Sequence, residues 1–153
     1  MLDQIIMISH VLFGVLGILF AVALFMDVLN GSERNFGRLK MMSWIILISM
    51  VLSFIVGGYW YVVYYPEHRG IIVAGPWPWA HTFFMEVKEH LFLTLLILSL
   101  YLPIAVHNGL PLTTKNAKRL ILGLCVLIVI IGLFMELSGG MIEQGIKMCL
   151  LKR

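Results

Sequence analysis

The sequence predicts an all-α fold, an integral membrane four-helix up-down bundle with short connections. Of its 153 residues, 61% are hydrophobic and only 12% are charged, and the mean hydropathy is +0.99. A soluble domain has about 25% charged residues, so this chain could not cover a water-exposed surface with polar side chains. Four apolar runs also reach the roughly 20 residues that a helix needs to cross about 30 Å of hydrocarbon.

Turn-forming residues separate the four runs. They lie at positions 30–32 after the first run, within 66–78 after the second and at 108–111 after the third. Connections this short allow only antiparallel neighbours, so we expect one domain of four helices in up-down order. The expected spans are residues 5–29, 41–64, 83–106 and 120–142 of a single domain that covers residues 1–153.

The tail of residues 143–153 follows the fourth span. Ile142, Ile146, Cys149 and Leu150 share one face if the tail is helical. An amphipathic helix with one apolar face is typical of a segment that lies in the membrane interface. We therefore expect the tail to be interfacial.

Basic residues in the connections predict the orientation. The second connection has only Arg69, and the N-terminal segment has none. Cytoplasmic loops are rich in Lys and Arg, so the first and third connections are expected inside the cell. Both termini of this multi-pass protein of the cell membrane then lie on the outer, periplasmic or extracellular side, although the tail carries Lys147, Lys152 and Arg153. The basic residues of the two inner connections are Arg34, Arg38, Lys40, Lys115, Lys118 and Arg119.

Aromatic residues crowd the outer ends of spans two and three. This distribution is typical of an aromatic belt that anchors a protein at the membrane interface. The connection of residues 66–82 is rich in Pro, Gly and Trp, which also fits a cap over the bundle. The belt residues are Trp60, Tyr61, Tyr64, Tyr65, Trp77 and Trp79.

Ionisable residues inside the spans are the main functional signal. Such a group costs several kcal/mol in hydrocarbon unless it is paired, hydrated or ligated, so each one marks a candidate site. On span three, Lys88 points nearly opposite to the acidic residues and the histidine around it, and it is expected to snorkel outwards or to pair with a carboxylate of another helix. Three of the four helices present His or Glu to one layer near the outer face: His10, Glu86, Glu89, His90 and Glu136.

This layer allows three interpretations. Haem b needs histidines at matched depth, and His10 and His90 would be its axial ligands, with Lys88 or Arg69 offsetting a propionate charge. A transition metal ion such as iron, copper or zinc would instead use His10, Glu86, Glu89, His90 and Glu136 as ligands. Buried carboxylates beside a histidine and a lysine are also suitable for a proton or ion path.

Structural roles explain part of the same pattern. Glu86, Lys88 and Glu89 would be a charged first turn if span three begins later, and the helix dipole favours acidic groups there. The glycines next to His10, Gly14 and Gly17, are more often a sign of close helix packing than of space for a flat macrocycle. Neither explanation covers the convergence of His10 with residues of two other helices.

The arrangement resembles the small four-helix membrane proteins of the copper-resistance D and protoporphyrinogen-oxidase J type. The similarity lies in His10 followed by Gly14 and Gly17, and in Lys88 near the head of span three, within residues 79–101. It covers about half of the chain in pattern. The resemblance implies handling of haem b or a metal, with redox chemistry.

Other features exclude several classes of function. We find no phosphate-binding loop, dinucleotide turn or nucleophile elbow, and the net charge of +3 lies in the connections, so no nucleic-acid partner is expected. Cys125 and Cys149 show no disulfide or zinc pattern. The leading hypothesis is a redox protein of the lipid bilayer. The alternatives are an accessory subunit of a larger membrane complex and a small proton- or metal-ion transporter that acts as a homo-oligomer.

Overall fold

The computed structural model describes residues 2–30, 36–109 and 114–151, and these residues are almost entirely helical, without a strand. The helices are α1 (Leu2–Leu29), α2 (Phe36–Val63), α3 (Tyr65–Ala74), the π-helix η2 (Ala80–Met85), α4 (Glu86–Gly109) and α5 (Lys115–Leu151). Arg34, Lys152, Arg153 and the turn residues 31–32 and 110–111 lie outside the described ranges.

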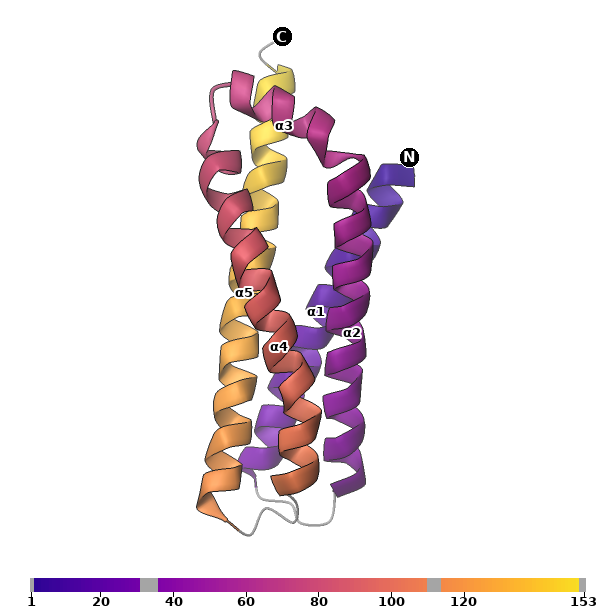
Figure 1. Cartoon of the computed structure of the whole chain (residues 1–153), viewed down its shortest axis with the longest axis vertical. Helices are drawn as coiled ribbons and strands as arrows, with labels where there is room; N and C mark the ends of the chain where they lie inside the picture. Colours follow the sequence, from indigo (N-terminus) through magenta and orange to yellow (C-terminus); the bar gives the residue numbers. More distant parts are fainter. Residues whose placement is uncertain (1, 31–35, 110–113, 152–153) are drawn as a thin grey trace.

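Four segments are long and apolar enough to cross a membrane: α1, α2, the continuous run of η2 and α4, and α5. They agree with the four expected spans, although α2 begins at Phe36 and α5 at Lys115, five residues before the expected starts. Consecutive long helices run in opposite directions, and α3 crosses the end at which both termini lie (Figure 1).

The tail differs from the expectation of a separate interfacial helix. Residues 143–151 continue α5 without a break. Ile142 and Cys149 are buried, and Ile146 packs with Ile72 of α3 in one apolar cluster. The protein's own α3 and η2 therefore cover most of the apolar face of the tail, although Leu150 stays exposed, because the connection between spans two and three folds back onto it.

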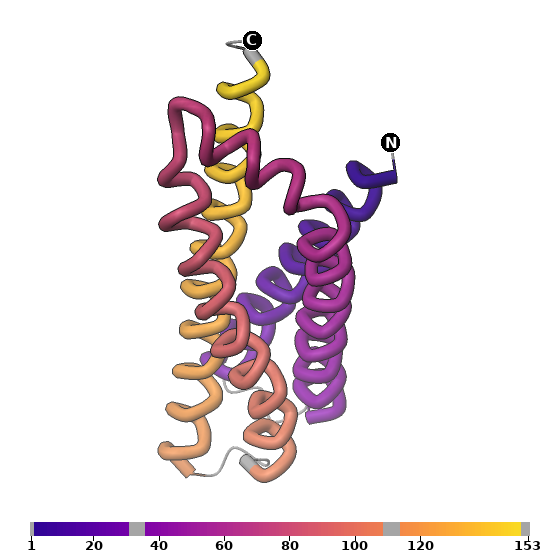
Figure 2. Tube along the Cα trace, turned by 45° about the horizontal axis from the view of Figure 1, so that its top comes forward, coloured from indigo at the N-terminus to yellow at the C-terminus, as the bar shows by residue number. Residues whose placement is uncertain are grey.

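Packing is tight in the half of the molecule near the α1–α2 and α4–α5 connections. Leu24, Ile46, Leu102 and Ile128, one from each long helix, are completely buried in a single core. In the other half the helices diverge under α3, as the tube in Figure 2 shows. A second, smaller cluster, which includes Tyr65 and Met85, closes that end.

Charged contacts also tie the α1–α2 end together. Arg38 of α2 forms an ion pair with Asp27 of α1, with Nε and Oδ2 2.8 Å apart. The ammonium group of Lys118 donates a 3.0 Å hydrogen bond to the carbonyl of Leu29. This contact supplies a partner for a terminal carbonyl of α1, which the helix itself leaves unpaired.

Candidate functional site: a cavity between two helix pairs

A cavity of about 530 Å³ lies in the diverging half, between the α1–α2 pair and the α4–α5 pair. Most of its wall is apolar and aromatic, including Phe54, Trp60, Met85 and Met135. Pockets of roughly 300–1,000 Å³ with apolar walls and a few polar groups are typical of small-molecule sites. The polar side chains of the wall come from all four long helices: His10, Ser53, Tyr61, Lys88, Glu89, Glu136 and Glu143.

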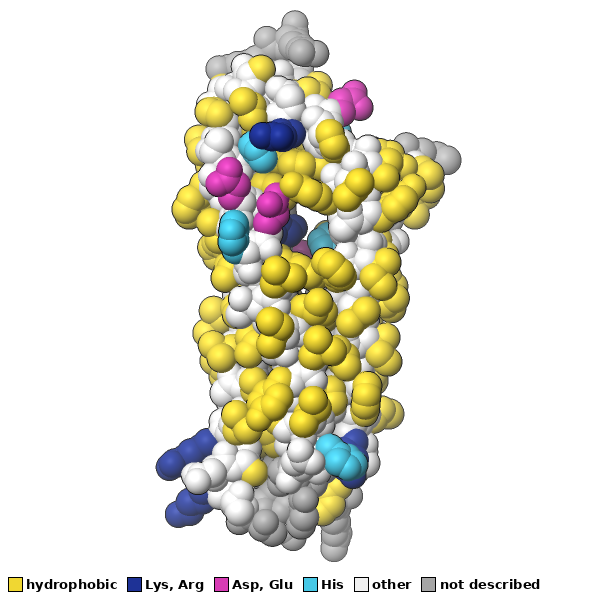
Figure 3. Space-filling view, viewed as in Figure 1, with side chains coloured by type: hydrophobic (Ala, Val, Ile, Leu, Met, Phe, Trp, Pro, Cys, Tyr) yellow, Lys and Arg dark blue, Asp and Glu magenta, His cyan; other side chains and the backbone are white. Residues whose placement is uncertain are grey.

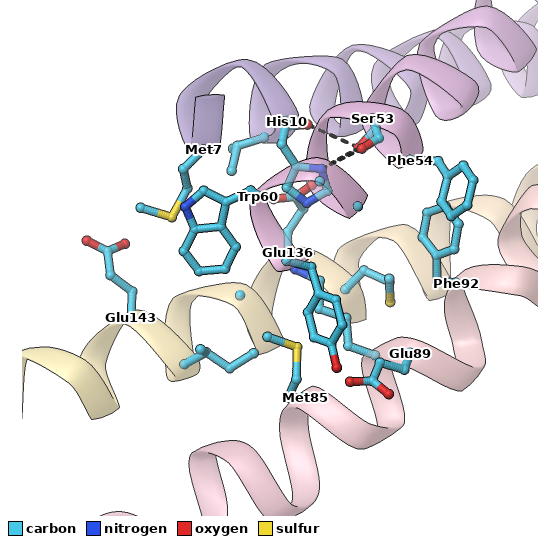
Figure 4. A pocket seen from close by; sticks show the side chains of 18 of the residues that line it. Met7, His10, Ser53, Phe54, Trp60, Met85, Glu89, Phe92, Glu136 and Glu143 are labelled. Carbon is cyan, nitrogen blue, oxygen red and sulfur yellow. Dashed lines mark hydrogen bonds between the residues drawn. The ribbon is translucent and has the colours of Figure 1, made fainter. Parts of the chain in front are cut away.

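His10 is held by α2 in one orientation (Figure 4). Its ring nitrogen Nδ1 lies 2.8 Å from the backbone carbonyl of Ser53 and 3.0 Å from the Ser53 hydroxyl. A carbonyl can only accept, so Nδ1 carries the proton and Nε2 keeps its lone pair. A second partner that fixes the tautomer in this way is typical of histidines that ligate metals through the other nitrogen.

Two glycines make room for the polar side chains of the cavity. A Cβ atom at Gly57 would lie 2.5 Å from Nδ1 of His10, so only glycine allows this ring to lie against α2. A Cβ atom at Gly14 would collide with Oε1 of Glu136. Gly14 and Gly57 therefore allow polar side chains of neighbouring helices to approach closely.

Lys88 and Glu136 face the cavity from α4 and α5. Among the described residues, neither side chain forms a hydrogen bond or an ion pair. Both groups are therefore available to a ligand in the cavity. Ionisable residues inside apolar spans mark candidate sites, so the cavity is the candidate functional site of this chain.

The five His and Glu residues that the sequence singled out are only partly brought together. His10, Glu89 and Glu136 line the cavity, whereas Glu86 and His90 are exposed and do not. His90 donates from Nδ1 to the carbonyl of Glu86, 2.7 Å away on its own helix. Within the described ranges no three His, Cys, Asp or Glu side chains form a group that could hold a metal ion.

The reason for this difference is the rotation of α4. Lys88 does point opposite to Glu86 and His90, as expected, but it is the Lys88 face that turns inwards. The π-helix η2 directly precedes α4. A π-helix has more residues per turn than an α-helix, so counting 3.6 residues per turn from Trp79 does not give the direction in which the side chains of α4 face.

A polar network under α3 closes the top of the cavity. Nε of Arg69 donates a 2.9 Å hydrogen bond to Nε2 of His81, so Nδ1 of His81 donates to the Tyr65 hydroxyl, 2.8 Å away. Burial, together with the neighbouring Tyr61 and Glu89, raises the pKa of Tyr65 well above its ordinary value of 10.0. This network fixes α3 to η2.

Sequence reasoning missed several residues of the site. Ser53 was not among the candidate site residues, and Trp60 was identified only as part of the aromatic belt. In the structure Trp60 lines the cavity, stacks on His68 and has a buried indole N–H without a partner. Only the contacts between helices identify these roles.

Comparison with known proteins gives no relative. No protein-family model, no curated protein and no solved structure matches this chain.

Proposed function

We propose that this chain is an integral membrane protein, an up-down bundle of four spans, whose cavity binds haem b for electron transfer. The membrane assignment is supported by large apolar side chains that point away from the bundle on every long helix. Leu12, Ile55, Ile97 and Leu137 are 58–70% exposed, and a chain in water would have to leave all of this surface hydrated.

The observation that carries the cofactor assignment is the placement of His10. Its Nε2 is unprotonated, its ring is held by Ser53, and it lines a cavity of suitable volume. Lys88 shares that cavity, so two of the residues that carry the resemblance to the four-helix haem and metal proteins line one site. Haem b is axially ligated by histidine in many proteins.

The donor set and the walls fit a haem. His10 would ligate the iron, and the ammonium group of Lys88 would offset the charge of a propionate. Glycines of α2 and α5, including Gly58 and Gly140, line the cavity and leave room for a flat macrocycle. When bound, haem b supplies one-electron transfer. The apolar wall excludes water, and His10 keeps its proton on Nδ1 through Ser53.

Optical spectroscopy with two histidine variants tests this function. The protein, purified in detergent and supplied with haemin, is expected to show a Soret band that is lost in His10→Ala. His90→Ala is the matched control, because His90 is exposed and lies outside the cavity, so this variant is expected to keep the band. A wild-type protein that binds no haem, or equal loss in both variants, would contradict the proposal.

A further inference from the structure

The cavity is open at its side. Phe54 of α2 and Phe92 of α4 stack with their ring centroids 4.6 Å apart, and this pair joins the two helices beside the cavity. Nearer to α3, the cavity wall includes Gly58 and Tyr61 of α2 and Glu89 of α4. The space-filling view in Figure 3 shows the molecule hollowed between these helices, with charged and histidine side chains visible inside.

The end of the bundle under α3 is closed. Tyr65 is 2% exposed, and Ile72 and Ala80 are completely buried, in a cluster that joins α3 and η2 to α5. Trp60 packs against this cluster from the cavity side. A ligand that entered along the bundle axis would therefore have to displace the whole cap.

Part of the rim of the side opening is apolar towards the outside. Phe54 is 41% exposed and Leu93 is 58% exposed, and both also line the cavity. This is the surface that hydrocarbon covers if the four segments span a membrane. The opening therefore leads from lipid, rather than from water, to His10 and Lys88.

We infer that the gap between α2 and α4 is a lateral portal that admits a ligand dissolved in the bilayer. The ligand class follows from the wall: a flat, mostly apolar molecule with an anionic edge that pairs with Lys88. This inference rests on the proposed function, because haem b is the ligand with which the portal is tested. The side chains of Tyr61 and Glu89 border the portal.

Tryptophan substitutions at glycines with open space around them test the portal. A Cβ atom would meet nothing within 4 Å at Gly58, Gly140 or Gly123, so each site accepts a side chain. Gly58 borders the portal, Gly140 lines the cavity from α5, and Gly123 lies outside it. With vesicles preloaded with haemin, Gly58→Trp is expected to slow the rise of the Soret band about tenfold, within the range by which association rates vary among variants of one site.

The controls separate the possible outcomes. Gly123→Trp is expected to leave the rate unchanged. If Gly140→Trp slows binding and Gly58→Trp does not, the ligand enters between α1 and α5 and the inference is wrong. If the wild-type protein binds haemin and all the tryptophan variants bind it at the same rate, the portal is wrong but the proposed haem binding is not contradicted.

A second measurement does not depend on haem. Gly139→Cys places a thiol in the cavity wall, and a membrane-partitioning maleimide in the vesicles is expected to modify it. Adding Gly58→Trp is expected to slow this modification about tenfold. The chain without Gly139→Cys measures the background modification of Cys125 and Cys149. An unchanged rate of thiol modification in the Gly58→Trp background would overturn the portal. Slower modification in a protein that binds no haem would support the portal and refute haem as the ligand.

Discussion

The backbone carbonyl of Ser53 accepts a hydrogen bond from the ring of His10, and the Ser53 hydroxyl donates a 3.1 Å hydrogen bond to the backbone carbonyl of His10. The two residues thus exchange hydrogen bonds between α1 and α2. Because the ring is held by a backbone carbonyl, its orientation does not depend on the serine side chain alone.

Ser53→Ala should therefore destabilise the protein without abolishing haem binding. The expected loss is about 0.6 kcal/mol, the average for a side-chain hydrogen bond between membrane helices, and thermal unfolding in detergent measures it. Ser138→Ala is the control, since the Ser138 hydroxyl bonds only to the carbonyl of Phe134 on its own helix, and it should cost less. Loss of the Soret band in Ser53→Ala would show that the hydroxyl, and not the carbonyl, positions the ring.

Gly14→Ala should lower both stability and haem affinity, because the new methyl group takes the space of the Glu136 carboxylate. Gly123→Ala, at an open position of α5, should be neutral or stabilising by up to about 1 kcal/mol through its helix propensity. Unfolding midpoints and haemin titrations of the two variants provide the comparison. Equal behaviour of the two would argue that Glu136 is free to move away from α1.

Lys88→Met should destabilise the protein, because Glu136 then faces the cavity without a nearby cation. Glu136→Gln should destabilise it as well, because Lys88 then faces the cavity without a nearby anion. The double variant should recover part of the loss, with an interaction energy of about 0.5–3 kcal/mol in a double-mutant cycle. Additive single effects would show that the two charges are solvated independently.

The raised pKa of Tyr65 predicts an alkaline loss of stability. The folded state holds the phenol proton more tightly than the unfolded state, so this contribution is complete below pH 10 and is lost as the pH rises above it. Tyr65→Phe removes the titrating group and should reduce this alkaline decline, although it also removes the hydrogen bond to His81. Unfolding midpoints of both proteins from neutral to alkaline pH test the sign, and a steeper decline in Tyr65→Phe would refute it.

The proposed orientation predicts opposite thiol accessibility at the two ends. Glu67 on α3 and Arg119 at the start of α5 are both exposed. In intact cells an impermeant maleimide should modify Glu67→Cys, whereas Arg119→Cys should react only after the membrane is opened. The reverse pattern would place the basic connections outside and invert the bundle.

The four long helices were predictable because apolar runs of this length are typical of helices that cross a membrane. The candidate site was predictable only in part. His10 and Glu136 were identified because polar groups at that depth are costly, and the structure places both in the cavity. Neither α3 nor the continuation of α5 was predicted, since a short helix and its covered face depend on contacts between segments far apart in the sequence.

By itself, the sequence determined that the chain forms four long apolar helices and that a few ionisable residues interrupt them. Only the tertiary structure decided which of those residues share a cavity. It turns Lys88 inwards and Glu86 and His90 outwards, and it gives His10 a partner on α2. The physical reason is that the depth of a residue along a helix follows from its position in the sequence. The direction in which its side chain faces depends on the winding of η2 and on how closely the glycines allow neighbouring helices to approach.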